Sequence, residues 1–158
     1  MTAAGFPKTQ YFIVISGSAA PTMIGTLTFT DALNFSLSDV QLWLQKVGAH
    51  VGGEMFRVSV YSDAAGTNRL FSSDWVTMTD ISSISSSSWY GYLTFPFSVP
   101  GNINNARSYY IGVEALGYTR AVDDSYYWVA AIDWPLAVNA YGSETYRGAA
   151  MSIVGLYS

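Results

Sequence analysis

Two alternating runs of apolar and polar residues, separated by a glycine-rich segment, constrain the fold of this chain most strongly. They lie in residues 40–63, VQLWLQKVGAHVGGEMFRVSVYSD. The alternating apolar positions are Val40, Leu42, Leu44, Phe56, Val58 and Val60. A period of two is that of a β-strand with one buried face, so the segment predicts two strands. Gly48, Gly52 and Gly53 tolerate the positive φ of a chain reversal, so we expect a β-hairpin with His50 in its turn.

Further runs with strand character recur along the chain, and no window of useful length has a helical period. We expect these strands at residues 11–16, 26–30, 69–78 with a break at 72–74, 89–97, 109–114, 126–132 and 149–156. Pro96 inside one run indicates an edge strand or a bulge. Residues 99–102 should end that strand, and residues 117–125 and 133–143 should be loops.

This pattern predicts an all-β fold, an antiparallel β-sandwich of eight to nine strands. We prefer jelly-roll connectivity over another Greek-key arrangement, because eight strands in two sheets suit it. The chain has 158 residues, the size of one domain, and we expect residues 1–8 to form an extended N-terminal arm. It contains no cysteine, so its stability must come from packing.

The charge balance argues against nucleic acid as a partner. The net charge is −4, and the seven basic residues are scattered singly, which gives no basic patch for phosphates. The apolar stretch YFIVI, residues 11–15, is too short for a secretory leader or a membrane span. We therefore expect no membrane association and synthesis in the cytoplasm.

Four segments in a fixed order resemble a β-sandwich module of bacteriophage virion proteins and secreted bacterial proteins. They are LWLQKVG, FRVSVYSDAAG, WYGYLTFPFSVP and RSYYIGVEA, and the similarity covers about residues 37–115. The matching residues are core and turn residues, so the resemblance transfers no catalytic or binding residue.

The resemblance implies a non-enzymatic structural virion protein that decorates or cements a phage capsid. A stand-alone module of this size is similar to the head-decoration proteins of tailed phages, which implies capsid or other virion subunits as partners. It also implies a homo-oligomer, for which we expect a trimer, and a location in the virion. Extended termini and strand edges are the grips of such proteins, which would give the arm and the YFIVI strand a role in β-augmentation.

Enzymatic chemistry finds little support in the sequence. His50 is the only histidine, and no nucleophile-elbow motif accompanies it. Glu54, Glu114 and Glu144 could pair only if the fold placed two of them at a suitable distance. We therefore predict no catalytic residue and no cofactor. A structural calcium at Asp123 and Asp124 is the one metal site considered, since loop carboxylates suit this ion.

Aromatic residues near the two ends of the chain are the candidates for contact with a partner or ligand. Tyr and Trp rings anchor protein interfaces and also stack on sugars. The alternative function is therefore a carbohydrate-binding β-sandwich module, or a tail or receptor-binding component, that holds a glycan with the late aromatics. Trp134, expected in a loop, is the best single contact residue. The predicted contact residues are Phe6, Tyr11, Phe12, Trp128, Trp134, Tyr141 and Tyr146.

Overall fold

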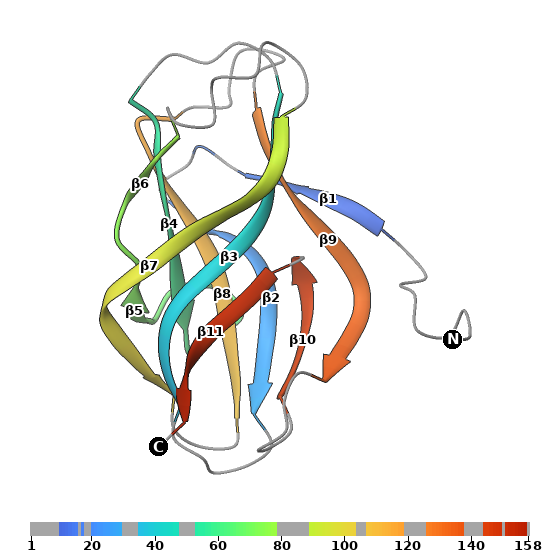
Figure 1. Cartoon of the computed structure of the whole chain (residues 1–158). Helices are drawn as coiled ribbons and strands as arrows, with labels where there is room; N and C mark the ends of the chain where they lie inside the picture. The colour runs from blue at the N-terminus through green and yellow to red at the C-terminus, as the bar shows by residue number, and fades with distance from the viewer. Residues whose placement is uncertain are drawn as a thin grey trace.

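The computed structural model describes residues 10–15, 17, 20–29, 35–47, 53–78, 89–103, 107–118, 126–137, 144–149 and 151–157. These residues include no α-helix, and so no helix that is long and apolar enough to cross a membrane. They form antiparallel strands that pack as a two-sheet β-sandwich, as predicted (Figure 1). The strands are β1 (Gln10–Val14), β2 (Thr22–Phe29), β3 (Phe35–Val47), β4 (Met55–Tyr61), β5 (Arg69–Ser72), β6 (Val76–Thr77), β7 (Trp89–Ile103), β8 (Ser108–Leu116), β9 (Tyr126–Ala137), β10 (Glu144–Ala149) and β11 (Met151–Tyr157).

Eight of the strands pair as a jelly roll requires. The eight strands, in chain order, are β1, β2, β3, β4, β5, β7, β8 and β9. The first and last of them pair (β1 with β9), and so do the next pairs inward, β2 with β8, β3 with β7 and β4 with β5. β9 also pairs with β3, and β8 with β4. The first sheet is thus β1-β9-β3-β7 and the second is β2-β8-β4-β5, which confirms the preferred connectivity.

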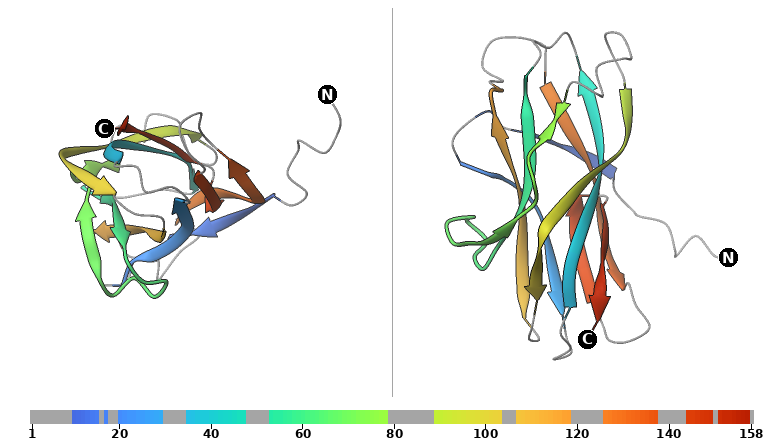
Figure 2. Two further views of the ribbon diagram at one scale, coloured as in Figure 1. Left: turned by 90° about the horizontal axis from the view of Figure 1, so that it is seen from below. Right: turned by 60° about the vertical axis from the view of Figure 1, so that its left-hand side comes forward.

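The remaining strands extend and join these two sheets. β6 continues the pairing of β4, and β11 pairs with the first half of β3. β10 lies between β9 and β2, so it links the first sheet to the second on one side. On the other side the backbone N–H of Asp74 donates to the carbonyl of Pro96 in β7, at 2.8 Å. Seen along the strands, the sheets surround a common interior (Figure 2).

The core consists of the apolar faces of the two sheets. The first sheet contributes Leu37, Val40, Leu42, Leu44, Phe95 and Ile103, and the second contributes Ile24, Leu27, Phe56, Val58, Val60, Ile111 and Val113. All six apolar positions of the two opening runs are fully buried. The period-two pattern therefore identified the core face of both strands correctly.

The predicted hairpin of residues 40–63 is wrong, although both of its strands exist. β3 pairs with β7, β9 and β11, whereas β4 pairs with β5, β6 and β8. The two strands belong to opposite sheets, and their apolar faces meet across the core. The alternation of apolar and polar residues predicts which face of a strand is buried, but it does not determine which other strands pair with it. The turn itself, with Gly48, His50 and Gly52, lies outside the described residues.

Other strand predictions were partly right. The break between β5 and β6 is confirmed, and so is the character of β7, which borders the first sheet and shifts register against β3 beside Pro96. β7 continues to Ile103 instead of ending at residues 99–102. β9 continues to Ala137, into the predicted loop at 133–143, where β10 pairs with it at Leu136 and Ala137. The expected last strand, 149–156, is divided into β10 and β11, which have different neighbours.

We expect Leu42→Ala to lower the free energy of unfolding by about 3 kcal/mol, because it removes a fully buried side chain and leaves a cavity in the core. Chemical denaturation followed by tryptophan fluorescence measures the change. Thr94→Ala is the matched control, since Thr94 is exposed on the neighbouring strand, and it should stay within about 0.5 kcal/mol. Equal losses in both variants would contradict the assignment of the core face.

Candidate functional site

The most elaborate polar cluster of the described residues lies on the outer face of the second sheet. Arg57 of β4 and Glu114 of β8 are directly opposite each other in the register of the two strands. Arg57 Nε donates to Glu114 Oε2 at 2.9 Å, and Arg57 Nη2 donates to Oε1 at 3.3 Å. This two-point contact matches the planar guanidinium to the planar carboxylate.

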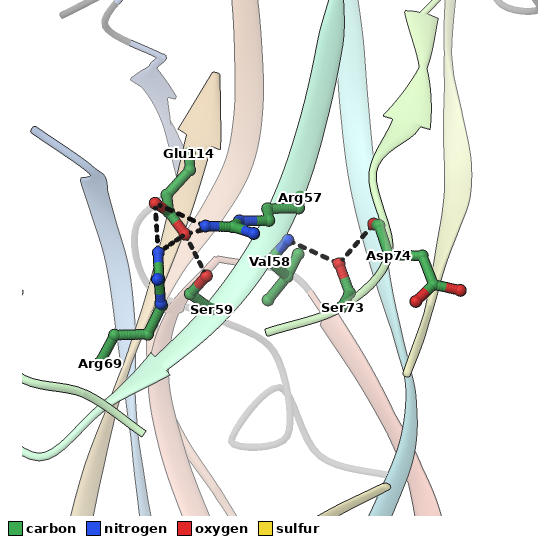
Figure 3. A network of polar contacts seen from close by, with 7 residues as sticks. All are labelled: Arg57, Val58, Ser59, Arg69, Ser73, Asp74 and Glu114. Carbon is green, nitrogen blue, oxygen red and sulfur yellow. Dashed lines mark hydrogen bonds and ion pairs between the residues drawn. The ribbon is translucent and has the colours of Figure 1, made fainter. Parts of the chain in front are cut away.

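Two further residues donate to the same carboxylate. Arg69, on the adjacent strand β5, places Nη1 at 3.0 Å from Oε1 and 3.2 Å from Oε2 of Glu114. The Ser59 hydroxyl donates to Oε2. Figure 3 shows the three donors converging on Glu114 from β4 and β5. We call Arg57, Ser59, Arg69 and Glu114 the Glu114 cluster.

The environment of the Glu114 cluster keeps Glu114 ionised. The side chains of Glu114 and Arg57 are 18% and 20% exposed, and that of Arg69 is 46% exposed. Burial by itself would raise the pKa of Glu114, but the hydrogen bonds from Arg57 and Ser59 and the charges of both guanidiniums outweigh it. The pKa of Glu114 therefore lies below its ordinary value, and at neutral pH the side chain is ionised and has no proton to donate.

Arg57 has a second contact that fixes its position. Its guanidinium carbon lies 4.5 Å from the centre of the Trp75 ring, in the segment between β5 and β6. A cation over an indole face is attracted to the π-electrons. The guanidinium thus ties Trp75 and Glu114 to β4, and the Glu114 cluster connects β8, β4 and β5 across the sheet.

A second set of polar contacts anchors the segment between β5 and β6. The Ser73 hydroxyl accepts a hydrogen bond from the backbone N–H of Val58 at 2.9 Å and donates to the carbonyl of Asp74 at 2.9 Å (Figure 3). Ser98 of β7 donates to the Asp74 carboxylate. Together with the Asp74–Pro96 backbone bond, these contacts hold the edge of the second sheet against β7.

The turn after β4 is organised by Asp63. Its carboxylate accepts bonds from the backbone N–H groups of Thr67 and Asn68 and from the Thr67 hydroxyl. These bonds, led by that from the Thr67 side chain, lower the pKa of Asp63. Gly66 has φ +72° and packs so closely that a Cβ there would lie 2.6 Å from the sulfur of Met23. The turn therefore folds down onto β2.

The carboxylates of Glu114 and Asp63 stabilise the fold. Glu114 is bound by two cations and Asp63 by its own turn, so neither is positioned as a general acid or base. Within the described part of the chain, no group of three His, Asp or Glu side chains could hold a metal ion. Asp123 and Asp124, the proposed calcium ligands, lie outside it.

Five of the seven predicted contact residues lie on β9 and on two strands that pair with it, β1 and β10. Tyr11 and Phe12 are in β1, Trp128 and Trp134 in β9, and Tyr146 in β10. β9 pairs with both other strands, with Trp128 opposite Val14 and Leu136 opposite Tyr146. Trp134 lies in a strand, so the prediction of a loop at this position is wrong. Phe6 and Tyr141 are outside the described residues.

No motif in the sequence indicates the Glu114 cluster. Arg57 and Ser59 alternate with buried residues, which placed them on an outer face, but Glu114, to which both donate, lies 57 and 55 positions further along the chain. Only the register between β4 and β8 brings these residues together. Comparison of the chain with family models, curated proteins and solved structures found no match.

Replacing Glu114 should weaken the fold in a pH-dependent manner. We expect Glu114→Gln to lower the free energy of unfolding at pH 7 by about 2 kcal/mol, because two guanidiniums lose their counter-charge. The folded-state pKa lies below the ordinary 4.5, so the contribution is complete above that pH and is lost as the pH falls through the folded-state value. The two proteins should therefore become similar in stability in acid, measured by urea unfolding at a series of pH values.

Arg69→Ala serves as the control for this experiment. Arg69 is the more exposed partner of Glu114, so its loss should cost only about 0.5 kcal/mol. A Glu114→Gln effect that does not change between neutral and acidic pH would contradict the ionised state assigned to Glu114.

Proposed function

We propose that this chain is a non-enzymatic structural virion protein that decorates or cements a phage capsid through protein–protein contacts, as a homo-oligomer. The four segments that resemble phage virion modules lie on or next to β3, β4, β7 and β8, of which β3, β4 and β8 are central strands of the two jelly-roll sheets and β7 borders the first. The resemblance therefore falls on the framework of the fold, which supports a role as a building unit.

The position of β1 carries the proposal. β1 pairs with β9, and no other described strand pairs with it, so its second side is an edge of the first sheet (Figure 1). An edge strand presents backbone N–H and C=O groups that an extended segment of another subunit can pair with. β1 also follows the proposed N-terminal arm directly, which suits attachment of the domain to a neighbouring subunit.

The polar groups of the second sheet support the same role. The Glu114 cluster joins three strands, and the contacts of Ser73 and Asp74 fasten the second sheet to β7. Such cross-strand bonds resist separation of the strands under load. A protein that holds a shell together benefits from this rigidity, whereas catalysis by these groups would need them free to bind a substrate.

Analysis of virions from the cells that carry this coding sequence tests the proposal. Mass spectrometry of purified particles should find the chain in a fixed ratio to the major capsid protein, and light scattering of the recombinant chain should give the mass of a trimer. Particles that lack the chain, together with a monomeric recombinant protein, would refute the proposal.

A truncated chain tests the part assigned to the arm. Removal of residues 1–8 should weaken sedimentation of the recombinant chain with particles, because the arm is lost while the edge of β1 and the core remain. The melting temperature of the truncated chain should stay within a few degrees of the full chain, which shows that the fold is retained. Unchanged sedimentation would contradict the role of the arm.

A further inference from the structure

The outer face of the second sheet changes character along its strands. Its middle is covered, because a Cβ at Gly112 would lie 2.9 Å from the Tyr61 ring and 3.0 Å from the sulfur of Met23. Tyr61 is only 3% exposed, although it alternates with the core residues of β4 and so lies on the outer face. The turn after β4 packs against Met23 through Gly66 and adds to this cover. The part of the face near the end of β8 differs.

At the end of β8, side chains from three strands are aligned across the outer face. Leu116 of β8 lies opposite Met55 of β4, and Met55 lies opposite Thr77 of β6. Directly opposite residues of neighbouring strands occupy the same face of a sheet. Each of the three is adjacent in sequence to a residue that faces the core, so the face that they share is the outer one. Leu116 is 53% exposed, and Met55 and Thr77 are half-buried.

Charged and aromatic side chains lie next to this row. The neighbouring outer positions belong to Arg57 on β4 and Glu114 on β8. Trp75 packs on the Arg57 guanidinium, and Arg69 extends from β5 to Glu114. We define the Leu116 surface as Met55, Arg57, Arg69, Trp75, Thr77 and Leu116.

The Leu116 surface combines the residue types that protein interfaces favour. Trp, Met and Arg are enriched at interfaces, and Trp and Arg supply much of the binding energy where they occur. Contacts with Trp75 and Glu114 already hold the Arg57 guanidinium, so its ordering on association would cost little. Leu116 supplies an apolar side chain that is largely in solvent and that association can bury.

The charge of this region is opposite in sign to that of the whole chain. Arg57 and Arg69 share one carboxylate, that of Glu114, which leaves a charge of +1. The chain as a whole carries −4, so its other charged residues together carry −5. The rest of the chain is therefore complementary in charge to the Leu116 surface, whereas two Leu116 surfaces would repel each other.

We propose that the Leu116 surface is the contact between copies of this chain, and that it binds an acidic region of the next copy. A contact between two different surfaces repeats around an axis and closes as a ring when the rotation allows, which suits the expected trimer. The inference rests on the proposed function, because it supplies the contact between copies that a homo-oligomer needs. β1, the proposed attachment to a neighbouring subunit of the capsid, belongs to the first sheet, so the two contacts use different parts of the domain.

Sedimentation velocity of the full chain, with one variant and its control, tests the inference. We expect an oligomer at about 50 mM salt that dissociates more readily at about 500 mM, because salt screens the attraction between charges. Leu116→Asp should raise the dissociation constant at least about tenfold, since it removes the apolar contact and places a negative charge against an acidic partner. Val99→Asp is the matched control, because Val99 is 79% exposed on β7 of the first sheet, and it should leave the constant unchanged.

A third variant tests the sign of the charge on the partner region. Leu116→Lys removes the same apolar side chain but adds a positive charge, so it should weaken association less than Leu116→Asp does. Equal losses in the two variants would contradict an acidic partner region. Thermal melting checks that each variant is folded, and we expect it to be, because both substitutions are at an exposed position.

The remaining outcomes separate this inference from the virion proposal. An oligomer that keeps its mass in Leu116→Asp would overturn the inference and leave the virion proposal standing. A parent chain that stays monomeric at low salt would also overturn it. Loss of sedimentation with particles in Leu116→Asp, with self-association unchanged, would place a capsid subunit on this surface and overturn the contact between copies. Absence of the chain from particles would count against the virion role alone, provided that Leu116→Asp still dissociates the oligomer.

Discussion

The structure depends on the burial of two alternating apolar faces against each other. Leu42 and Leu44 in the first sheet and Phe56 and Val58 in the second are fully buried, and each such side chain contributes about 1.5 to 3 kcal/mol on removal from water. Neither sheet could bury its apolar face alone. Their packing commits every second residue of the central strands to the core and leaves the residues between them for the two outer faces.

The outer face of the second sheet carries polar contacts between its strands. On the second sheet Arg57 and Arg69 both pair with Glu114 across three strands, and the Asp63 turn folds down onto β2. These charged side chains therefore stabilise the pairing of β4, β5 and β8.

The margins of the sandwich show where the fold is closed. β10 connects the sheets on one side by pairing with both β9 and β2, and the Asp74–Pro96 bond with the Ser98 contact joins them on the other. Closure of this kind removes strand edges at which chains could associate. Among the described strands β1, β5, β7 and β11 each pair with a single strand, and the proposed contact with neighbouring subunits lies at the edge of β1.

The sequence by itself determined the class of fold, the buried positions and most of the strands. The reason is local: a period of two, as in Phe56, Val58 and Val60, reflects the pleat of one strand and needs no knowledge of its partners. The preferred connectivity proved correct, although it rested on the number of strands. The sequence also placed Arg57 on an outer face.

Only the tertiary structure decided which strands are neighbours. Two strands joined by a glycine-rich turn bury their apolar faces equally well side by side or across a core, and the chain adopts the second arrangement for β3 and β4. The partner of Glu114 and the alignment of Trp43 with Tyr92 are consequences of register between distant segments. Register is set by the packing of the whole sandwich, which is why the Glu114 cluster could not be predicted from the order of residues.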